Sequence, residues 1–151
     1  MSVIELTRGY QAVIDDEDLP LVAGFKWRAQ VMPTTVYAVR QVGRRMVYLH
    51  GLLTGWPRVD HVDCDGLNNR RSNLRPATQQ ENLYNTRKRA GTTSRFKGVS
   101  LHGPGRWRAA IQLDGAKRHL GLYRSEIAAA AAYDIAACAL FGDFARLNLG
   151  R

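Results

Sequence analysis

Residues 86–94, TRKRAGTTS, restrict most strongly how this chain can fold. Successive basic residues beside Gly, Thr and Ser are typical of a linker, because such a segment has no apolar face to bury. The linker divides the 151 residues into two parts, each within the size range of a small domain. The sequence therefore predicts a first domain over residues 1–88, a linker over 89–94 and a second domain over 95–151.

The first part begins with patterns typical of strands. Residues 3–13 alternate loosely between apolar and polar positions, and residues 35–40 do so again. Between them, four acidic residues at 15–18 precede an apolar segment, which indicates a short helix with acids in its first turn. The same carboxylates would also suit a metal, but the start of a helix explains them more simply. Another extended run follows at 46–49, and one or two helical turns end at Gly55.

The second part predicts a sheet packed on one helix. Extended stretches at 95–101, 106–113 and 117–123 are separated by the turn sequences HGPG and DG, which indicates three antiparallel strands. Ser125 suits a helix N-cap, residues 126–141 are rich in alanine, and Gly142 suits the end of a helix. The helix must cover the sheet, because a lone three-stranded sheet cannot bury a core. The predicted fold class is α+β, with a β-rich N-terminal section.

The charge balance favours nucleic acid as the partner. Lys and Arg number 22 against 13 Asp and Glu, which gives +9 and a pI of about 10.2. Such a chain attracts polyanions, although a merely basic soluble protein would show the same balance. Cys64 and Cys138 have no CxxC spacing and are expected to be reduced thiols. The N-terminus lacks a leader pattern and Asp134 interrupts the longest apolar stretch, so we expect no membrane span and a cytoplasmic location.

The polar stretch at 58–89 contains the residues best suited to catalysis. Asp60 and His61 precede the loop DCDGLNNRRS, Asn73 follows His61 by twelve residues, and Asn82 follows nine later on a predicted helix. A neutral imidazole accepts a proton from water near pH 7, so His61 is a candidate general base. Carboxylate and amide oxygens are hard ligands, so Asp60 and Asn82 are candidates for holding a divalent cation. These roles are those that phosphodiester hydrolysis requires.

Other interpretations of the same stretch fit less well. One is a polar loop ending in a helix cap, which explains one His better than it explains four polar residues at these spacings. A calcium-binding loop counted from His61 requires Glu at its twelfth position, where the chain has Ser72. A zinc site built on His50, His61 and Cys64 lacks a suitably spaced fourth ligand.

The segment at 59–85 resembles the HNH, or ββα-metal, nucleases, and Tyr48-Leu49-His50 extends the resemblance loosely. The resemblance implies a ββα-metal core and metal-dependent DNA cleavage in a phage-borne or homing-type enzyme. It implies one Mg²⁺, which Mn²⁺ is able to replace. It gives Asn73 the role of bracing the loop and helping to orient His61. Arg71 and Arg75, as cations in the same segment, are candidate phosphate contacts. One such centre cuts one strand, so a monomer would nick, and a homodimer or two encounters would break both strands.

The second part resembles the DNA-binding domain of plant ethylene-response factors, the Apetala family, which also occurs fused to phage-type HNH nucleases. The resemblance rests on FKGV at 96–99, Trp107, Leu120-Gly121, AYD at 132–134 and ARLN at 145–148. In that family the sheet enters the major groove of double-stranded DNA. Strand alternation also leaves one face of residues 107–112 polar, although a solvated basic face would look the same. The predicted DNA contacts are Lys97, Ser100, His102, Arg106, Arg108, Gln112, Lys117 and His119.

The sequence therefore predicts a divalent-metal-dependent DNA endonuclease. Its nuclease centre lies in the first part and its choice of target rests mainly on residues 97–119. The alternatives are a sequence-specific DNA-binding regulator with an inactive nuclease centre, and an RNA-binding or structural protein. Ser100, Pro104 and Ala110 differ from the residues that the plant domains place there, so no plant target sequence is transferred.

Overall fold

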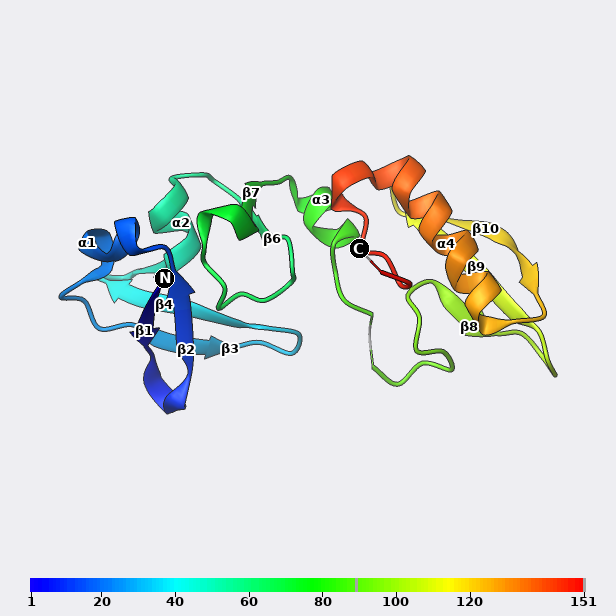
Figure 1. Cartoon of the computed structure of the whole chain (residues 1–151), viewed down its shortest axis with the longest axis horizontal. Coiled ribbons are helices and arrows are strands. Elements are labelled where there is room, and N and C mark those ends of the chain that lie inside the picture. Colours follow the sequence, from blue (N-terminus) through cyan, green and yellow to red (C-terminus); the bar gives the residue numbers. More distant parts are fainter. Residues whose placement is uncertain (89, 151) are drawn as a thin grey trace. The chain divides into compact units, whose positions relative to one another are not determined.

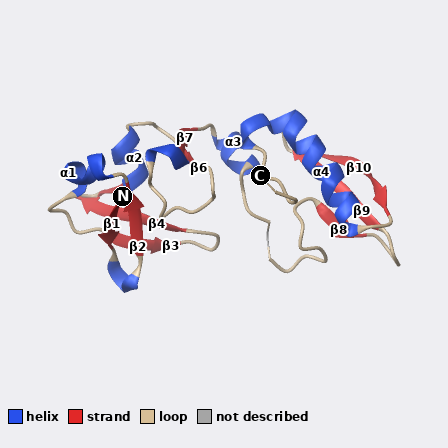
Figure 2. Ribbon diagram, viewed as in Figure 1, coloured by secondary structure: helices blue, strands red, loops and turns tan. Residues whose placement is uncertain are grey.

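The computed structural model describes residues 1–88 and 90–150, which form two compact units, Met1–Asn82 and Leu83–Arg151 (Figure 1). The units divide within helix α3 (Gln79–Tyr84), whereas the sequence predicts a later boundary at residues 89–94. Arg89, the first residue of that predicted linker, lies outside the described residues. Both units mix helices with small antiparallel sheets (Figure 2).

The first unit contains two small sheets beside its polar segment. The stretch at 3–13 forms two paired strands, because Arg8 and Gly9 turn the chain with φ values of 64° and 73°. Next comes a three-stranded sheet in which the middle strand pairs with both neighbours. The elements are β1 (Ser2–Glu5), β2 (Gln11–Ile14), α1 (Leu19–Val22), β3 (Arg28–Val31), β4 (Val36–Val42), β5 (Arg45–Tyr48) and α2 (Leu49–Thr54).

The core of the first unit lies between these elements. Ile14 from β2 and Leu49 from α2 are fully buried, and Val22 and Trp27 close the cluster. A turn of 3-10 helix at Asp16–Asp18 leads directly into α1. The helix predicted after the acidic residues therefore begins with a tighter 3-10 turn and contains only four residues of α-helix, Leu19–Val22. Gly55 ends α2 with a φ of 68°, a conformation that glycine adopts without steric cost.

The polar segment forms a two-stranded ladder followed by a helix. Strand β6 (Val59–His61) pairs with β7 (Leu74–Pro76), so that Asp60 lies opposite Arg75. Helix α3 follows, and Thr78 and Glu81 cap its start reciprocally, each side chain accepting from the other's backbone N–H. The loop at 62–73 is held to β2, because Val13 N–H donates to Leu67 O and Asn69 N–H donates to Val13 O, at 2.8 and 2.7 Å.

The second unit is a three-stranded antiparallel sheet covered by helix α4 (Glu126–Phe141). The strands β8 (Val99–Leu101), β9 (Trp107–Leu113) and β10 (Ala116–Tyr123) follow one another along the chain, with β9 in the middle. Alanines of α4 are fully buried against the sheet, which permits a close approach. Gly98 has a φ of +75°, and a Cβ there would lie 2.0 Å from the Tyr133 ring, so this close approach requires glycine.

Helix α4 begins where the sequence predicts it. The Ser125 hydroxyl accepts from Ala128 N–H at 3.4 Å, and the Gly142 N–H donates to Cys138 O at the other end. Together with the turn that follows, the helix is long and apolar enough to cross a membrane by length and composition. Ala129, Ala130 and Ala137 on its inner face nevertheless lie buried against the sheet.

Candidate active site

His61 ends strand β6 and is 5% exposed. Its Nε2 lies 3.4 Å from Oδ1 of Asn69, whose Nδ2 donates to Gly66 O at 3.3 Å. Because that donation directs Oδ1 towards the imidazole, the contact favours the tautomer that carries its proton on Nε2. Burial lowers the pKa of His61, against the opposing effects of Asn69 and nearby carboxylates. The site therefore favours the neutral imidazole that a general base requires.

Asn69 is a functional candidate that the sequence analysis missed. It is fully buried, and its backbone is fixed to Val13 on β2. In the sequence it is one of several Asn and Arg residues in the loop, and only the folded contact with His61 distinguishes it. Asn69 therefore contacts the imidazole directly, and the orienting role that the resemblance gives to Asn73 stays a prediction.

Asn73 braces the loop through Asp63. Its Oδ1 accepts from Asp63 N–H at 3.1 Å, and its Nδ2 donates to Asp63 Oδ1 at 2.9 Å and to Asn68 O at 2.8 Å. Partial burial alone would raise the pKa of Asp63, but hydrogen bonds from Asp65, Asn68 and Asn73 outweigh it and lower that pKa. Asp63 is thus an ionised centre around which the loop folds.

The loop also lies directly on an aromatic ring of the sheet. A Cβ at Gly66 would lie 2.5 Å from the Tyr37 ring and 2.5 Å from Val36 O, so no larger residue fits without movement. The Tyr37 ring centroid lies 5.9 Å from that of His61, and the His50 centroid lies 5.1 Å from it. The imidazole is therefore enclosed by β4 and α2 as well as by its own loop.

Asn82 on α3 contacts the strand that carries Asp60. Asn82 Nδ2 lies 3.5 Å from Val59 O, next to Asp60, which brings α3 against β6. Asn82 Oδ1 is buried and has no hydrogen-bond partner among the described residues. Such an atom is costly unless something satisfies it, and a divalent cation prefers this kind of hard oxygen. The two residues therefore fit the role of metal ligands, with water and phosphate oxygens completing the set.

Arg75 contacts Asp60 across the ladder. Its Nε and Nη2 donate to Asp60 Oδ2 at 2.8 and 2.5 Å, and both side chains are largely buried. Arg71 makes a similar fork onto the buried Asp18, with Nη2 2.6 Å from Oδ1, and its backbone N–H donates to Asp15. Both arginines thus have positioning contacts within the protein, and a phosphate contact by either stays a prediction.

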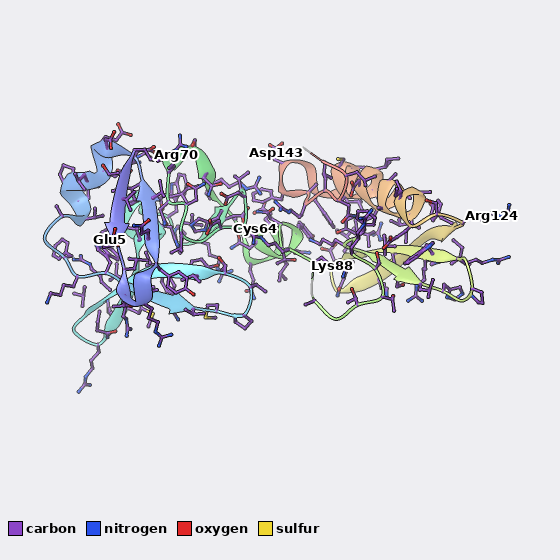
Figure 3. All side chains as sticks on the ribbon, turned by 60° about the horizontal axis from the view of Figure 1, so that its bottom comes forward. Glu5, Cys64, Arg70, Lys88, Arg124 and Asp143 are labelled. Carbon is purple, nitrogen blue, oxygen red and sulfur yellow. The ribbon has the colours of Figure 1, made fainter. Side chains whose placement is uncertain are left out.

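The acidic run at 15–18 serves the loop rather than a metal. Arg70 Nε lies 3.5 Å from Asp15 Oδ1, and in Figure 3 Arg70 and Cys64 project from the same loop. Within residues 1–88 and 90–150, no group of three or more His, Cys, Asp or Glu side chains is arranged to hold a metal.

The second unit gathers five of its predicted DNA contacts on one face. Ser100 pairs with Arg108 and Gln112 with Lys117, so each pair points to the same side, away from α4. His119, opposite Ala110, shares that side, and Arg108 Nε donates to Ser100 Oγ at 3.3 Å. Arg124 projects from the turn between β10 and α4 (Figure 3).

The other three predicted contacts lie elsewhere. His102 and Arg106 flank the turn between β8 and β9, where His102 N–H donates to Arg106 O at 2.8 Å. The Lys97 ammonium donates to Tyr84 O at 2.6 Å and to Thr86 O at 2.9 Å. Lys97 therefore holds the segment after α3 onto the second unit, and the structure places it apart from the outward face of the sheet.

Comparison with known proteins identifies the family. No family model matches the sequence. The chain is 30% identical over 146 residues to an uncharacterised HNH endonuclease of Acanthamoeba polyphaga mimivirus, which covers 93% of this chain and 76% of that protein. The chain belongs to the HNH endonuclease family. Half of this HNH family member is also similar to APETALA2-like protein 2 of rice, subspecies indica and japonica, with 41% identity over 81 residues and 19% of the rice protein covered.

Proposed function

We propose that this chain is a divalent-metal-dependent DNA endonuclease that hydrolyses phosphodiester bonds, with His61 as the general base. The proposal rests on one observation above all: in a member of the HNH endonuclease family, a buried His61 follows Asp60 on a strand that Asn82 of α3 contacts. We further assign β6, β7 and α3 to the ββα-metal core of that family, because two antiparallel strands are followed directly by a helix that supplies Asn82.

In the proposed reaction, His61 takes the proton of the attacking water. Burial keeps the pKa of His61 low, so the imidazole is neutral near pH 7 and able to accept that proton. Asn69 orients the ring by its contact with Nε2. Asn73 acts one contact further away, because it holds the loop that carries Asn69.

Asp60 and Asn82 would hold one divalent ion, Mg²⁺ or Mn²⁺, through their side-chain oxygens. The chemistry supplied by the bound ion is neutralisation of charge on the phosphate and on the leaving oxygen. Arg75 orients the Asp60 carboxylate through a two-pronged contact with Oδ2. The orphaned Oδ1 of Asn82 supports this assignment, since without a cation the atom is desolvated and unsatisfied.

We propose that the second unit recognises double-stranded DNA with the outward face of its sheet. The similarity to APETALA2-like protein 2 supports an Apetala-type domain, and the shared orientation of Ser100, Arg108, Gln112, Lys117 and His119 supports the face. Choice of target would then rest mainly on the second unit. The first unit would supply the cleavage.

The test is cleavage of supercoiled plasmid by the full chain with Mg²⁺ or Mn²⁺. We expect nicked or linear products that EDTA abolishes, and loss of cleavage in His61→Ala with DNA binding retained. An intact plasmid with every metal and candidate target would refute the nuclease, and retained binding would then favour a DNA-binding regulator with an inactive centre. Cleavage that His61→Ala leaves unchanged would place the base elsewhere.

A further inference from the structure

A hollow of about 320 Å³ lies beside the candidate site in the first unit. Its walls come from β5, from α2 and from residues 56–59. Val59 lines the hollow and is the residue before Asp60 on β6, so the hollow and one candidate metal ligand, Asp60, share this strand. The volume is at the lower end for small-ligand pockets, which suits one flat ring system.

The walls combine aromatic rings with a cation. Tyr48, His50 and Trp56 line the hollow together with Arg58. Trp56 is 38% exposed, an unusual position for so large an apolar ring. Burial first, and then the charge of His61, lower the pKa of His50 to about 4, so His50 presents an uncharged ring at neutral pH. Aromatic rings that stack on bases beside a basic side chain are the common means of holding single nucleotides.

The hollow is within reach of the reacting phosphate. The His50 ring centroid lies 5.1 Å from that of His61. The His50 side chain therefore both lines the hollow and contacts His61, the proposed general base. Each nucleotide of a duplex strand advances about 3.4 Å along the helix axis, so we expect a base in the hollow to lie within one or two nucleotides of a phosphate beside His61.

We propose that this hollow binds one nucleobase of the cleaved DNA strand, stacked on Trp56 and adjacent to the scissile phosphate. This inference rests on the proposed nuclease function. It gives the first unit a contact of its own with a base of the substrate. Arg58, which lies 3.4 Å from Gln79 through Nη1 and Oε1, would contact the backbone of the same nucleotide. Taking a base out of the stack costs energy, so the contact favours sites whose stacking beside the cut is weak.

The experiment is an abasic scan of a synthetic duplex that carries the mapped cleavage site. In the wild-type chain, we expect removal of one base within two nucleotides of the cut to raise KM by roughly 5- to 150-fold. Trp56→Ala should raise KM on the intact duplex by a similar factor, and removing the base should then raise KM no further. In Trp56→Phe, which keeps an aromatic ring, removing the base should still raise KM, but by a smaller factor than in the wild type. Phe25→Ala, which removes another exposed aromatic ring of the same unit, should leave the scan unchanged.

A scan with no sensitive position beside the cut, or a penalty that Trp56→Ala leaves intact, would overturn the inference while cleavage itself stands. If the wild-type chain cuts no DNA, the nuclease proposal fails, and photocrosslinking tests the hollow separately. Duplexes carrying iodouracil should then crosslink within residues 46–59, and Trp56→Ala should remove the crosslink. Crosslinks confined to the second unit, or capture of no base at all, would show that the hollow does not bind a nucleobase.

Discussion

Acidification should destabilise the first unit chiefly through His50. Burial, and then the charge of His61, lower the pKa of His50 from 6.5 to about 4 in the folded protein. The unfolded chain therefore binds more protons than the folded one between these values, and stability rises with pH in that window. The stabilising contribution of His50 is therefore complete above about pH 6.5 and is lost as the pH falls towards 4.

The magnitude follows from the size of the pKa shift. Each unit of pKa difference is worth about 1.4 kcal/mol, so the full contribution is roughly 3 kcal/mol, and about 2 kcal/mol of it is lost by pH 5. The pKa of His61 is also lowered by burial, so His61 adds a contribution of the same sign. Asp63 contributes in a different pH range. Because its pKa is lowered in the folded protein, the stability that its carboxylate contributes is lost only below about pH 4.

The assay is urea unfolding between pH 4.5 and 7.5 in EDTA. With Trp56→Phe and Trp107→Phe, fluorescence reports Trp27, which is buried in the core of the first unit. His50→Leu should reduce the dependence of unfolding free energy on pH to the share that His61 contributes. His102→Leu, at an exposed position of the second unit, should leave it unchanged. An unaltered pH dependence in His50→Leu would refute the reasoning.

Three further substitutions, and Gly51→Ala as a control, test the loop, the positioning of His61 and the outward face of the sheet in the second unit. Gly66→Ala should destabilise the first unit by about 1–3 kcal/mol in urea unfolding, because its Cβ meets Tyr37 and a backbone oxygen. Gly51→Ala, with open space around it in α2, should be neutral or stabilise by about 0.5–1 kcal/mol, and equal losses would contradict this explanation. Asn69→Leu should lower kcat for cleavage more than it changes KM, and an unaltered kcat would remove Asn69 from the positioning of His61. Lys117→Met should reduce the slope of log affinity against log salt by about 1, and an unchanged slope would place Lys117 away from phosphate.

Local signals account for what the sequence predicts well. The helix expected over residues 126–141 occurs at Glu126–Phe141, because its Ser125 cap and its Gly142 end are set by residues within one turn. The β9–β10 turn likewise occurs at the DG pair, where Asp114 and Gly115 both adopt positive φ. The strand expected to carry Asp60 and His61 and the helix expected to carry Asn82 also occur, as β6 and α3.

Contacts between distant residues account for what the sequence could not predict. The acidic run at 15–18 indicated a helix start, yet Asp18 binds Arg71, which lies 53 residues further on. Nothing local to either residue specifies this partner. The same holds for Asn69, whose contact with His61 depends on the loop being attached to Val13 of β2. Several asparagines of the loop are equivalent in sequence, and only the tertiary fold separates the one that touches the base.

The pairing of Asp60 with Arg75 leads to a last prediction about metal affinity. The two residues are opposite each other in the ladder, and the guanidinium forks onto Oδ2. A positive charge there opposes a second cation on the same carboxylate, while Asn82 Oδ1 remains unsatisfied without one. The protein would therefore hold its metal weakly until the phosphate of the substrate contributes further negative charge.

Replacing Arg75 tests this balance directly. Arg75→Gln should bind Mn²⁺ more tightly in the absence of DNA, measured by calorimetry, while Arg75→Lys should stay near the wild-type affinity because it keeps the charge. With DNA present, the difference in Mn²⁺ affinity between Arg75→Gln and the wild type should shrink, because the substrate phosphate adds negative charge beside the metal in both proteins. Weaker Mn²⁺ binding by Arg75→Gln would contradict this prediction. It would show that Arg75 aligns Asp60 for the metal, and that this alignment outweighs the repulsion between the arginine and the cation.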